Sequence, residues 1–260
     1  RLQSGELLFF YLRKNADDDL QVFVRRSADE GSTWSAPLMV TSGSGYLVMN
    51  NARVVQLSSG RLLAPCAWNP GTWRQTGAAR ASVGVVYYSD DDGRSWQASA
   101  SRVKLAGIGC QEPGVVELSD GRVLMIIRNS LGTIHKSYSA DGGETWSEPV
   151  SMGIGAPVAP STIVKIPSTG DLLLIWNDCL RDDPRAEPVR RPLTAAISRD
   201  DGETWEHRRD LETEAPYWYA YTSVTFVQDR ALLTYWVHDR RPTPNLLHLK
   251  LRSLPVRWFY

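Results

Sequence analysis

One eight-residue pattern occurs four times in this sequence and restricts the possible folds more than any other feature. It reads Ser-x-Asp-x-Gly-x-Ser/Thr-Trp, and its copies occupy residues 27–34, 89–96, 139–146 and 198–205. Serine and aspartate side chains hydrogen-bond to nearby backbone, and glycine adopts the positive φ that a tight turn needs. Each copy therefore predicts a tight turn, with its tryptophan packed against the neighbouring hairpin.

A second pattern, a polar turn followed by apolar residues, precedes each copy. It is centred on Gly5, Gly60, Gly121 and Gly170, and a degenerate fifth copy surrounds Arg230. These positions are separated by 55, 61, 49 and 60 residues, and each is typical of a turn between two strands. In the third repeat the predicted strands are 113–119, 122–129 and 133–139, followed by a strand after Trp146.

Four strands in a repeat of this length are typical of β-propeller blades. We therefore predict an all-β fold in which residues 1–260 form one propeller domain with about five visible blades. The first blade has no residues for its first strand, because the sequence opens at Arg1. We expect an N-terminally incomplete chain whose first strand is missing or is replaced by residues 246–251.

Composition excludes several classes of function. Lys+Arg and Asp+Glu both number 29, and zero net charge argues against nucleic acid or an anionic membrane as the main partner. No apolar run is long enough for a membrane span. Cys66, Cys110 and Cys179 include no C-x-x-C motif, so we expect no metal and no disulfide scaffold, although one disulfide stays open. We expect no cofactor and a monomer, with an oligomer left open. The compartment is also open, with a secreted or periplasmic location favoured over the cytoplasm.

The repeat also predicts where polar side chains meet. Inner strands of a propeller line its channel, and their starts meet at one mouth. Polar residues lie nine positions before the turn centres, at Asn51, Glu112, Ser161 and Tyr221. Second strands run antiparallel to the first, so their ends return to the same mouth. The second and third strands add Arg128, Asn177, Asp19 and Arg190.

These residue types suit an anionic sugar. Two arginine forks can hold a carboxylate through paired hydrogen bonds. Carboxyl side chains perform acid–base work on glycosides, and a tyrosine paired with a glutamate can act as nucleophile. Trp68 lies close in sequence to this mouth, while Asn51 and Arg53 either line the pocket or cap a strand. The eight-residue turns lie at the opposite face, so we expect them to be structural.

The eight-residue unit is the Asp box, or BNR repeat, and four copies at blade spacing resemble the sialidase (neuraminidase) superfamily of six-bladed β-propellers. The resemblance covers essentially the whole chain and is closest around residues 110–128, 190–198 and 219–223. It implies a six-bladed fold. The Asp box also occurs in lyases, other glycosidases and non-enzymatic proteins, so function must be argued from the site.

The resemblance also implies roles for particular residues. Arg128 and Arg190 resemble two members of the arginine triad that grips the sugar carboxylate. The first triad arginine stands in an Arg-Ile-Pro motif that this sequence does not contain. Tyr221 resembles the nucleophile, and Glu112 resembles the base that polarises its hydroxyl.

The acid–base aspartate of the family lies in the loop of the first blade, where Asp17 or Asp18 is the candidate. The substrate-binding candidates are Arg128, Arg190, Asn51, Arg53, Asn177 and Trp68, and Tyr219 is a rival to Tyr221 as nucleophile.

The leading hypothesis is a retaining exo-sialidase that releases terminal sialic acid from glycoconjugates through a tyrosyl intermediate. Its partners would be sialylated glycans or free acidic sugars. One alternative is a propeller hydrolase or lyase acting on another acidic sugar. The other is a non-catalytic propeller that binds glycans or proteins.

Overall fold

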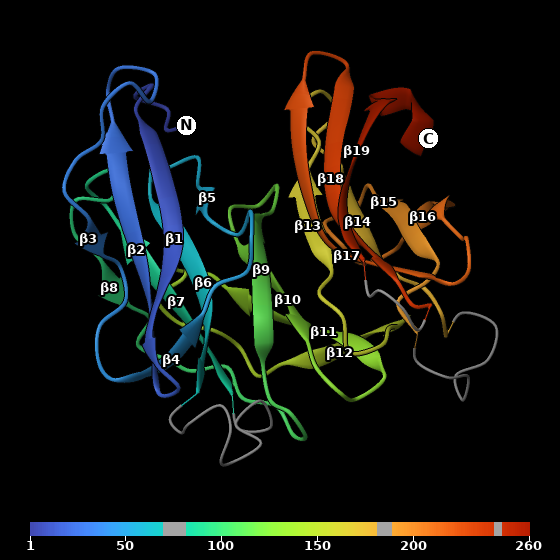
Figure 1. Cartoon of the computed structure of the whole chain (residues 1–260), viewed down its shortest axis with the longest axis horizontal. Helices are drawn as coiled ribbons and strands as arrows, with labels where there is room; N and C mark the ends of the chain where they lie inside the picture. The colour runs from blue at the N-terminus through green and yellow to red at the C-terminus, as the bar shows by residue number, and fades with distance from the viewer. Residues whose placement is uncertain (70–81, 181–188, 242–245) are drawn as a thin grey trace.

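The computed structural model describes residues 1–69, 82–180, 189–241 and 246–260, and regular structure there consists of strands and one short 3-10 helix, η2 (Val256–Phe259). The strands of the first two blades lie at one side of the molecule, β9 lies in the middle, and the strands from β13 to β19 lie towards the other side (Figure 1). None of the described segments forms a helix long and apolar enough to cross a membrane.

The first two blades form one eight-stranded sheet. Its strands are β1 (Leu7–Ala16), β2 (Asp19–Ser27), β3 (Leu38–Met39), β4 (Gly45–Val48), β5 (Val55–Gln56), β6 (Leu62–Asn69), β7 (Val83–Ser89) and β8 (Gln97–Ala98). The inner strand of the second blade is split into β4 and β5. Because β4 pairs in parallel with β2, through Asp19–Gly45 and Leu20–Tyr46, the two blades join where the sequence predicts separate ones.

The remaining blades are separate sheets, as the repeat predicts. The third comprises β9 (Gln111–Glu117), β10 (Val123–Arg128), β11 (Thr133–Ser139) and β12 (Val150–Gly155). The fourth comprises β13 (Thr162–Lys165), β14 (Leu172–Asn177), β15 (Leu193–Ser198) and β16 (Glu206–Glu212). The fifth has three strands, β17 (Tyr217–Val227), β18 (Arg230–Asp239) and β19 (Leu247–Pro255). The first three strands of the third repeat agree with the predicted ranges to within two residues.

The first blade has no inner strand among the described residues, because β1 pairs with β2 alone. The described chain is therefore a partial propeller. A hollow of about 500 Å³ lies beside the inner face of β1, between Leu8, Phe10 and Leu12 and residues 49–54. Of the two expected alternatives, the first holds among the described residues: the strand is missing, and residues 246–251 do not replace it. Residues 247–251 belong to β19, which pairs along its whole length with β18, because a sequence neighbour offers an antiparallel partner after a short connection.

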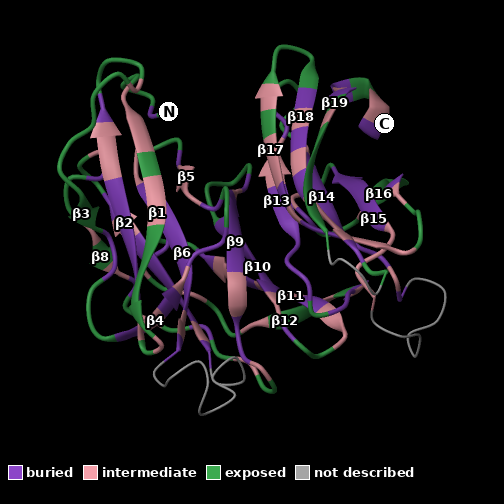
Figure 2. Ribbon diagram, viewed as in Figure 1, coloured by how far each residue is buried: buried purple, intermediate pink, exposed green. Residues whose placement is uncertain are grey.

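The core is a series of layers between successive blades. Along β10, Leu124 and Ile126 pack towards the fourth blade, whereas Val123 and Met125 pack towards the second. Side chains of a strand alternate between faces, so a central blade with neighbours on both sides needs a continuous apolar run. Figure 2 shows this as buried stretches along β10 and β14, while β19 is exposed over much of its length. All three cysteines are free, so the single disulfide left open by the sequence is absent.

The four Asp boxes have the turn geometry that the sequence predicts. In each copy the serine hydroxyl donates to the aspartate at 2.7–2.8 Å and accepts the glycine N–H at 2.8 Å. The Thr or Ser hydroxyl donates to the second carboxylate oxygen at 2.5–2.6 Å. The four glycines have φ between 80° and 94°, a conformation that residues with a Cβ rarely adopt.

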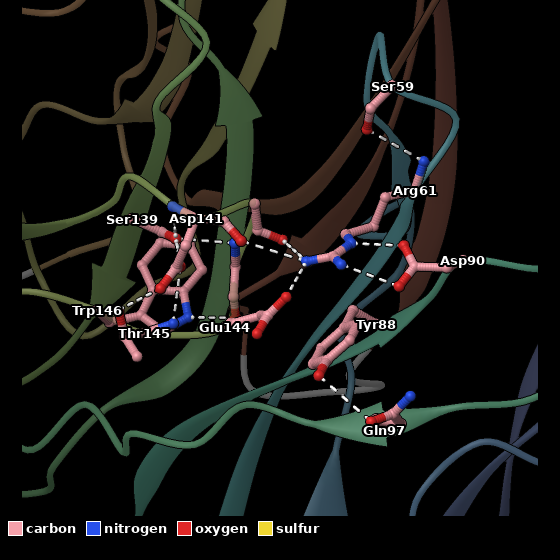
Figure 3. Close-up of polar contacts among 12 residues, drawn as sticks. Ser59, Arg61, Tyr88, Asp90, Gln97, Ser139, Asp141, Glu144, Thr145 and Trp146 are labelled. Carbon is pink, nitrogen blue, oxygen red and sulfur yellow. Dashed lines mark hydrogen bonds and ion pairs between the residues drawn. The ribbon is translucent and has the colours of Figure 1, made fainter.

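The Asp boxes also link adjacent blades. Arg61 follows the turn of the second blade, and its guanidinium bonds Asp90 at 2.6 and 2.9 Å. It also donates to the backbone carbonyl of Asp141 at 3.2 Å and to Glu144 at 2.8 Å, both in the Asp box of the third blade (Figure 3). One side chain thereby joins the second blade to the third.

Candidate active site

A cavity of about 220 Å³ lies at the end of the blades opposite the Asp boxes. The two ends are fixed by register, because Leu62 pairs with the Asp-box residue Ser89 while Asn69, at the other end of β6, lines the cavity. Strands of the second, third and fifth blades contribute the lining. The lining residues are Tyr46, Val48, Ala67, Asn69, Gln111, Glu112, Arg128 and Tyr221.

Glu112 and Tyr221 share an unusual backbone conformation. Their φ values are 39° and 60°, the left-handed region that residues other than glycine rarely adopt. Each lies at a register shift, in β9 opposite the end of β10 and in β17 opposite β18. Such bulges re-aim a side chain, and backbone strain is concentrated at functional sites. The two repeat-equivalent positions therefore turn their side chains into one cavity.

The Glu112 carboxylate is shared between a cation and a phenol. Its Oε2 forms an ion pair with Nη1 of Arg128, and both side chains are 14% exposed. The Tyr221 hydroxyl donates to its Oε1 at 3.4 Å. A base within hydrogen-bond reach is what a tyrosine needs to attack at neutral pH.

A second arginine lies against the tyrosine. The Arg190 guanidinium carbon is 5.9 Å from the ring centroids of both Tyr221 and Trp236, and Nη2 donates to the carbonyl of Val158 at 3.2 Å. Burial, followed by repulsion from Arg128, lowers the pKa of Arg190. The Nε of Arg128 has no hydrogen-bond partner among the described residues. Two arginines held together in this way provide an environment for an anion.

Asn51 and Arg53 contact backbone around the site. Asn51 Nδ2 donates to the carbonyl of Tyr221 at 3.1 Å. Arg53 is 4% exposed and donates to the carbonyl of Ser161 at 2.7 Å and to Thr162 Oγ1 at 3.4 Å. Burial lowers the pKa of Arg53 to about 10, although the Glu112 charge acts in the opposite direction. The sequence left open whether Asn51 and Arg53 line the pocket or cap a strand, and these contacts favour the structural role over pocket lining.

The structure does not bring Asn177 or Trp68 to the cavity, which corrects their expected contact with substrate. Asn177 is 2% exposed, and its amide donates to the carbonyl of Tyr219 at 3.1 Å. The Trp68 indole donates to the carbonyl of Ser44 at 3.0 Å. Because side chains alternate along a strand, Trp68 faces away from the cavity that Ala67 and Asn69 line.

Asp17 and Asp18 form the turn between β1 and β2, and neither lines the cavity. The hairpin still approaches its rim. Lys14, which pairs with Asp17 at 2.8 Å, has its Nζ 5.7 Å from the ring centroid of the cavity residue Tyr46.

Tyr219, the rival nucleophile, is 2% exposed in the core of the fifth blade. Its hydroxyl donates to the carbonyl of Glu214 at 3.2 Å, and burial raises its pKa to about 12. Both features make Tyr219 a poor nucleophile.

Sequence reasoning missed five lining residues. These are Tyr46, Val48, Ala67, Asn69 and Gln111. Ala67 stands seven positions after Gly60, just as Arg128 stands seven positions after Gly121. The repeat therefore marks Ala67 as a lining position, but the count considered only polar side chains. The sequence contains no such signal for the other four residues, because their place at the cavity depends on the split of the inner strand and on the register between strands.

Residues 1–233 match the BNR repeat-like domain. The chain belongs to the BNR-repeat sialidase superfamily. Among curated relatives, this BNR-repeat chain is 23% identical to a sialidase of Bacteroides fragilis over 82% of its own length and 38% of the relative's. It is 31% identical to a sialidase of Micromonospora viridifaciens over 58% of its length and 23% of the relative's. The chain thus spans well under half of either relative.

Solved structures share the fold of this BNR-repeat chain. The intramolecular trans-sialidase of Ruminococcus gnavus superposes with a TM-score of 0.72 at 22% identity, covering 92% of this chain and 51% of that one. The leech intramolecular trans-sialidase gives a TM-score of 0.71 at 22% identity, covering 92% and 37%. At this identity the likeness establishes the sialidase β-propeller fold.

Proposed function

We propose that this chain carries the active site of a retaining exo-sialidase, which releases terminal sialic acid from glycoconjugates through a tyrosyl–enzyme intermediate. One observation carries the proposal: the Tyr221 hydroxyl contacts Glu112 in a cavity shared with Arg128, and Arg190 lies beside the tyrosine ring. A propeller used only as a scaffold has no need of this combination.

Arg128 and Arg190 bind the carboxylate of the sugar in this proposal. Their guanidinium groups are fixed, by Glu112 in one case and by aromatic rings and a carbonyl in the other. A substrate carboxylate relieves the repulsion between them, and charge-assisted hydrogen bonds to arginine forks orient the sugar. The same carboxylate would repel an anionic nucleophile, which favours a neutral phenol as the attacking group.

The first step breaks the glycosidic bond. The phenolic oxygen of Tyr221 attacks the anomeric carbon while its proton passes to Glu112, and the leaving oxygen departs with a proton from an acid. By family resemblance that acid is Asp17 or Asp18, on the hairpin at the rim. Arg128 supports the charge that develops on the phenol as the proton leaves.

The second step returns the enzyme to its starting state. A hydroxyl group attacks the anomeric carbon and gives its proton to the aspartate that acted as acid in the first step, the bond to Tyr221 breaks, and Glu112 returns its proton to the phenolate. Two inversions give net retention. Water as attacker gives hydrolysis, whereas an internal hydroxyl of the sugar gives the intramolecular transfer for which the leech and Ruminococcus gnavus proteins are named.

The proposal is tested with a fluorogenic sialoside and a fluorinated sialic acid. The wild type should release the fluorophore, and mass spectrometry should locate the trapped sugar on a peptide containing Tyr221. Tyr221→Phe should retain the fold and sugar binding but lose most turnover, because the nucleophile is gone. An adduct on Tyr219, or full activity in Tyr221→Phe, would contradict the mechanism.

A matched panel of uronides separates the proposal from its main alternative. Cleavage of uronides without cleavage of sialosides would make the chain a hydrolase or lyase of another acidic sugar. Binding of sialosides without turnover by either panel would favour a non-catalytic propeller. Analysis of the released sugar distinguishes free sialic acid from an internal anhydro product.

A further inference from the structure

We propose that Thr162 and Arg53 act as positioning residues for Tyr221, by holding the backbone bulge on which that side chain stands. The inference rests on the proposed function, because it takes Tyr221 as the nucleophile. It assigns a role in turnover to two buried residues that do not line the cavity.

The bulge leaves two residues without strand partners. In β17, Ala220 pairs with Trp236 and Ser223 pairs with Thr234, so Tyr221 and Thr222 have no partners in the register with β18. Buried carbonyl groups in such a position need other hydrogen-bond donors. At Thr222, which is 3% exposed, the donor must therefore come from elsewhere in the protein.

Two other blades supply those donors. Asn51, from the second blade, donates its amide to the carbonyl of Tyr221 at 3.1 Å. Thr162, at the start of β13 in the fourth blade, donates its hydroxyl to the carbonyl of Thr222 at 2.7 Å. Thr162 is 2% exposed and Thr222 is 3% exposed, so water does not compete for this hydrogen bond.

Arg53 fixes Thr162 in turn. Its guanidinium donates to Thr162 Oγ1 at 3.4 Å and to the carbonyl of Ser161 at 2.7 Å. The threonine hydroxyl accepts from the arginine, which directs its proton towards Thr222. A Cβ at Gly114, in β9, would lie 3.4 Å from the guanidinium, so glycine leaves room for this side chain to cross the third blade.

The arrangement explains why a buried arginine can serve a site that it does not line. Arg53 forms no ion pair among the described residues, and its hydrogen-bond acceptors are a carbonyl and a hydroxyl. The chain Arg53–Thr162–Thr222 holds the left-handed backbone at Tyr221, whose φ is 60°. A small displacement of a reacting group can lower turnover by about 100-fold, so the hydrogen bonds matter for the rate.

The test compares Thr162→Val, which removes the hydroxyl at nearly constant volume, with Thr162→Ser, which keeps it. Thr169→Val, at the turn after β13 near the opposite end of the blade, controls for loss of a threonine hydroxyl elsewhere. With a fluorogenic sialoside, Thr162→Val should lower kcat by about 10- to 100-fold with little change in KM, because the arginine clamp is intact. Thr162→Ser should restore kcat.

A second readout does not depend on activity. NMR of the protein labelled at the tyrosine Cζ, with Tyr221 assigned through Tyr221→Phe, reports on the environment of the ring. Thr162→Val should shift the Tyr221 resonance, while Thr162→Ser and Thr169→Val should leave it in place. If Thr162→Val does not fold, Arg53→Lys, which keeps the charge but shortens the reach to Thr162, takes its place with the same expectation.

The outcomes separate the two proposals. Normal kcat and an unshifted resonance in Thr162→Val would overturn the positioning role while leaving the sialidase proposal intact. An inactive wild type would refute the sialidase proposal, and the resonance alone would then decide whether Thr162 positions Tyr221. Equal losses in Thr162→Val and Thr162→Ser would also overturn the inference, because the hydroxyl would not be the cause.

Discussion

At the scale of single residues, the site depends on pairs of side chains that modify each other. Glu112 contacts Arg128 through one oxygen and Tyr221 through the other, so the same carboxylate can orient the arginine and accept the phenol proton. Arg190 lies against the ring of Tyr221 and experiences repulsion from Arg128. A bound carboxylate would remove that repulsion.

Arg190 and Arg191 provide the first prediction. Arg190→Ala should lower kcat/KM by an amount corresponding to about 2–5 kcal/mol, because one charge-assisted partner of the sugar carboxylate is lost at a desolvated site. Arg191→Ala should have a much smaller effect, since it is the Arg190 guanidinium that lies over the Tyr221 ring. Steady-state kinetics with a sialoside measures both. A larger loss in Arg191→Ala would show that the other arginine holds the carboxylate.

Counting along the repeat predicts at which end of a blade a residue lies, but not the direction in which its side chain points. It placed Glu112, Arg128 and Tyr221 at one mouth, where the structure also brings them together. It failed for Asn177, whose amide bonds a backbone carbonyl away from the cavity, and closeness in sequence likewise failed for Trp68. Direction depends on bulges and on strand pairing across blades, which a repeat count does not contain.

At the scale of the structural element, the Asp box is a turn stabilised by its own side chains and used as a contact between blades. Arg61 and Arg122 follow equivalent turns and stack on equivalent tyrosines, Tyr88 and Tyr138. Arg61 also reaches the next Asp box, whereas the hydrogen bonds of Arg122 go to Asp120 in its own turn.

This pair gives the second prediction. Arg61→Met should lower the free energy of unfolding by about 1.5–3 kcal/mol, because half-buried hydrogen bonds to charged groups are lost. Arg122→Met should lower it by about 0–1 kcal/mol, as expected for an exposed pair. Urea denaturation of the two variants measures the difference. Equal effects would mean that the link between blades contributes nothing to stability.

The Asp boxes also predict a dependence of stability on pH. Hydrogen bonds from the hydroxyl and then the N–H of Thr204 hold the pKa of Asp200 at about 2, below the ordinary value near 4. Because the folded pKa is depressed, the stabilisation is complete above about pH 4 and is lost as the pH falls towards 2.

Asp200→Asn should therefore flatten the fall in unfolding free energy between pH 4 and pH 2, and Thr204→Val should do so partly. Denaturant titrations at a series of pH values measure these slopes. An unchanged slope in Asp200→Asn would exclude this carboxylate as a source of acid sensitivity.

Local chemistry explains which elements the sequence could predict. The Asp boxes and hairpin turns depend on residues within a few positions of each other, and they were predicted correctly. The split of the second inner strand into β4 and β5, and the pairing of β19 with β18, depend on competition between distant strands. Sequence patterns mark strands but do not choose their partners.

At the scale of the whole molecule, the stabilising apolar contacts form layers between successive blades. The first and last blades have fewer neighbouring blades than the central ones. β14 is buried at every position, whereas much of β1 and β19 is exposed, including Leu249 at 77%. The central blades therefore hold more of the apolar contacts that resist local opening.

Hydrogen exchange followed by mass spectrometry should show this difference. Amides of β10 and β14 should exchange most slowly, and those of β1 and β19 most rapidly, although all four strands are hydrogen-bonded. Uniform protection would instead indicate that the described chain opens only as a single unit.

The cavity is built from residues that are far apart in the sequence, and this determines when it can form during synthesis. Glu112 and Tyr221 are 109 residues apart in the chain, and Asn51 and Tyr221 are 170 apart. Contacts this distant form late, after local hairpins, and a nascent chain folds from its N-terminus. A growing chain would thus contain Glu112 and Arg128 long before Tyr221 is synthesised, and this cavity could not be completed until the fifth blade has folded.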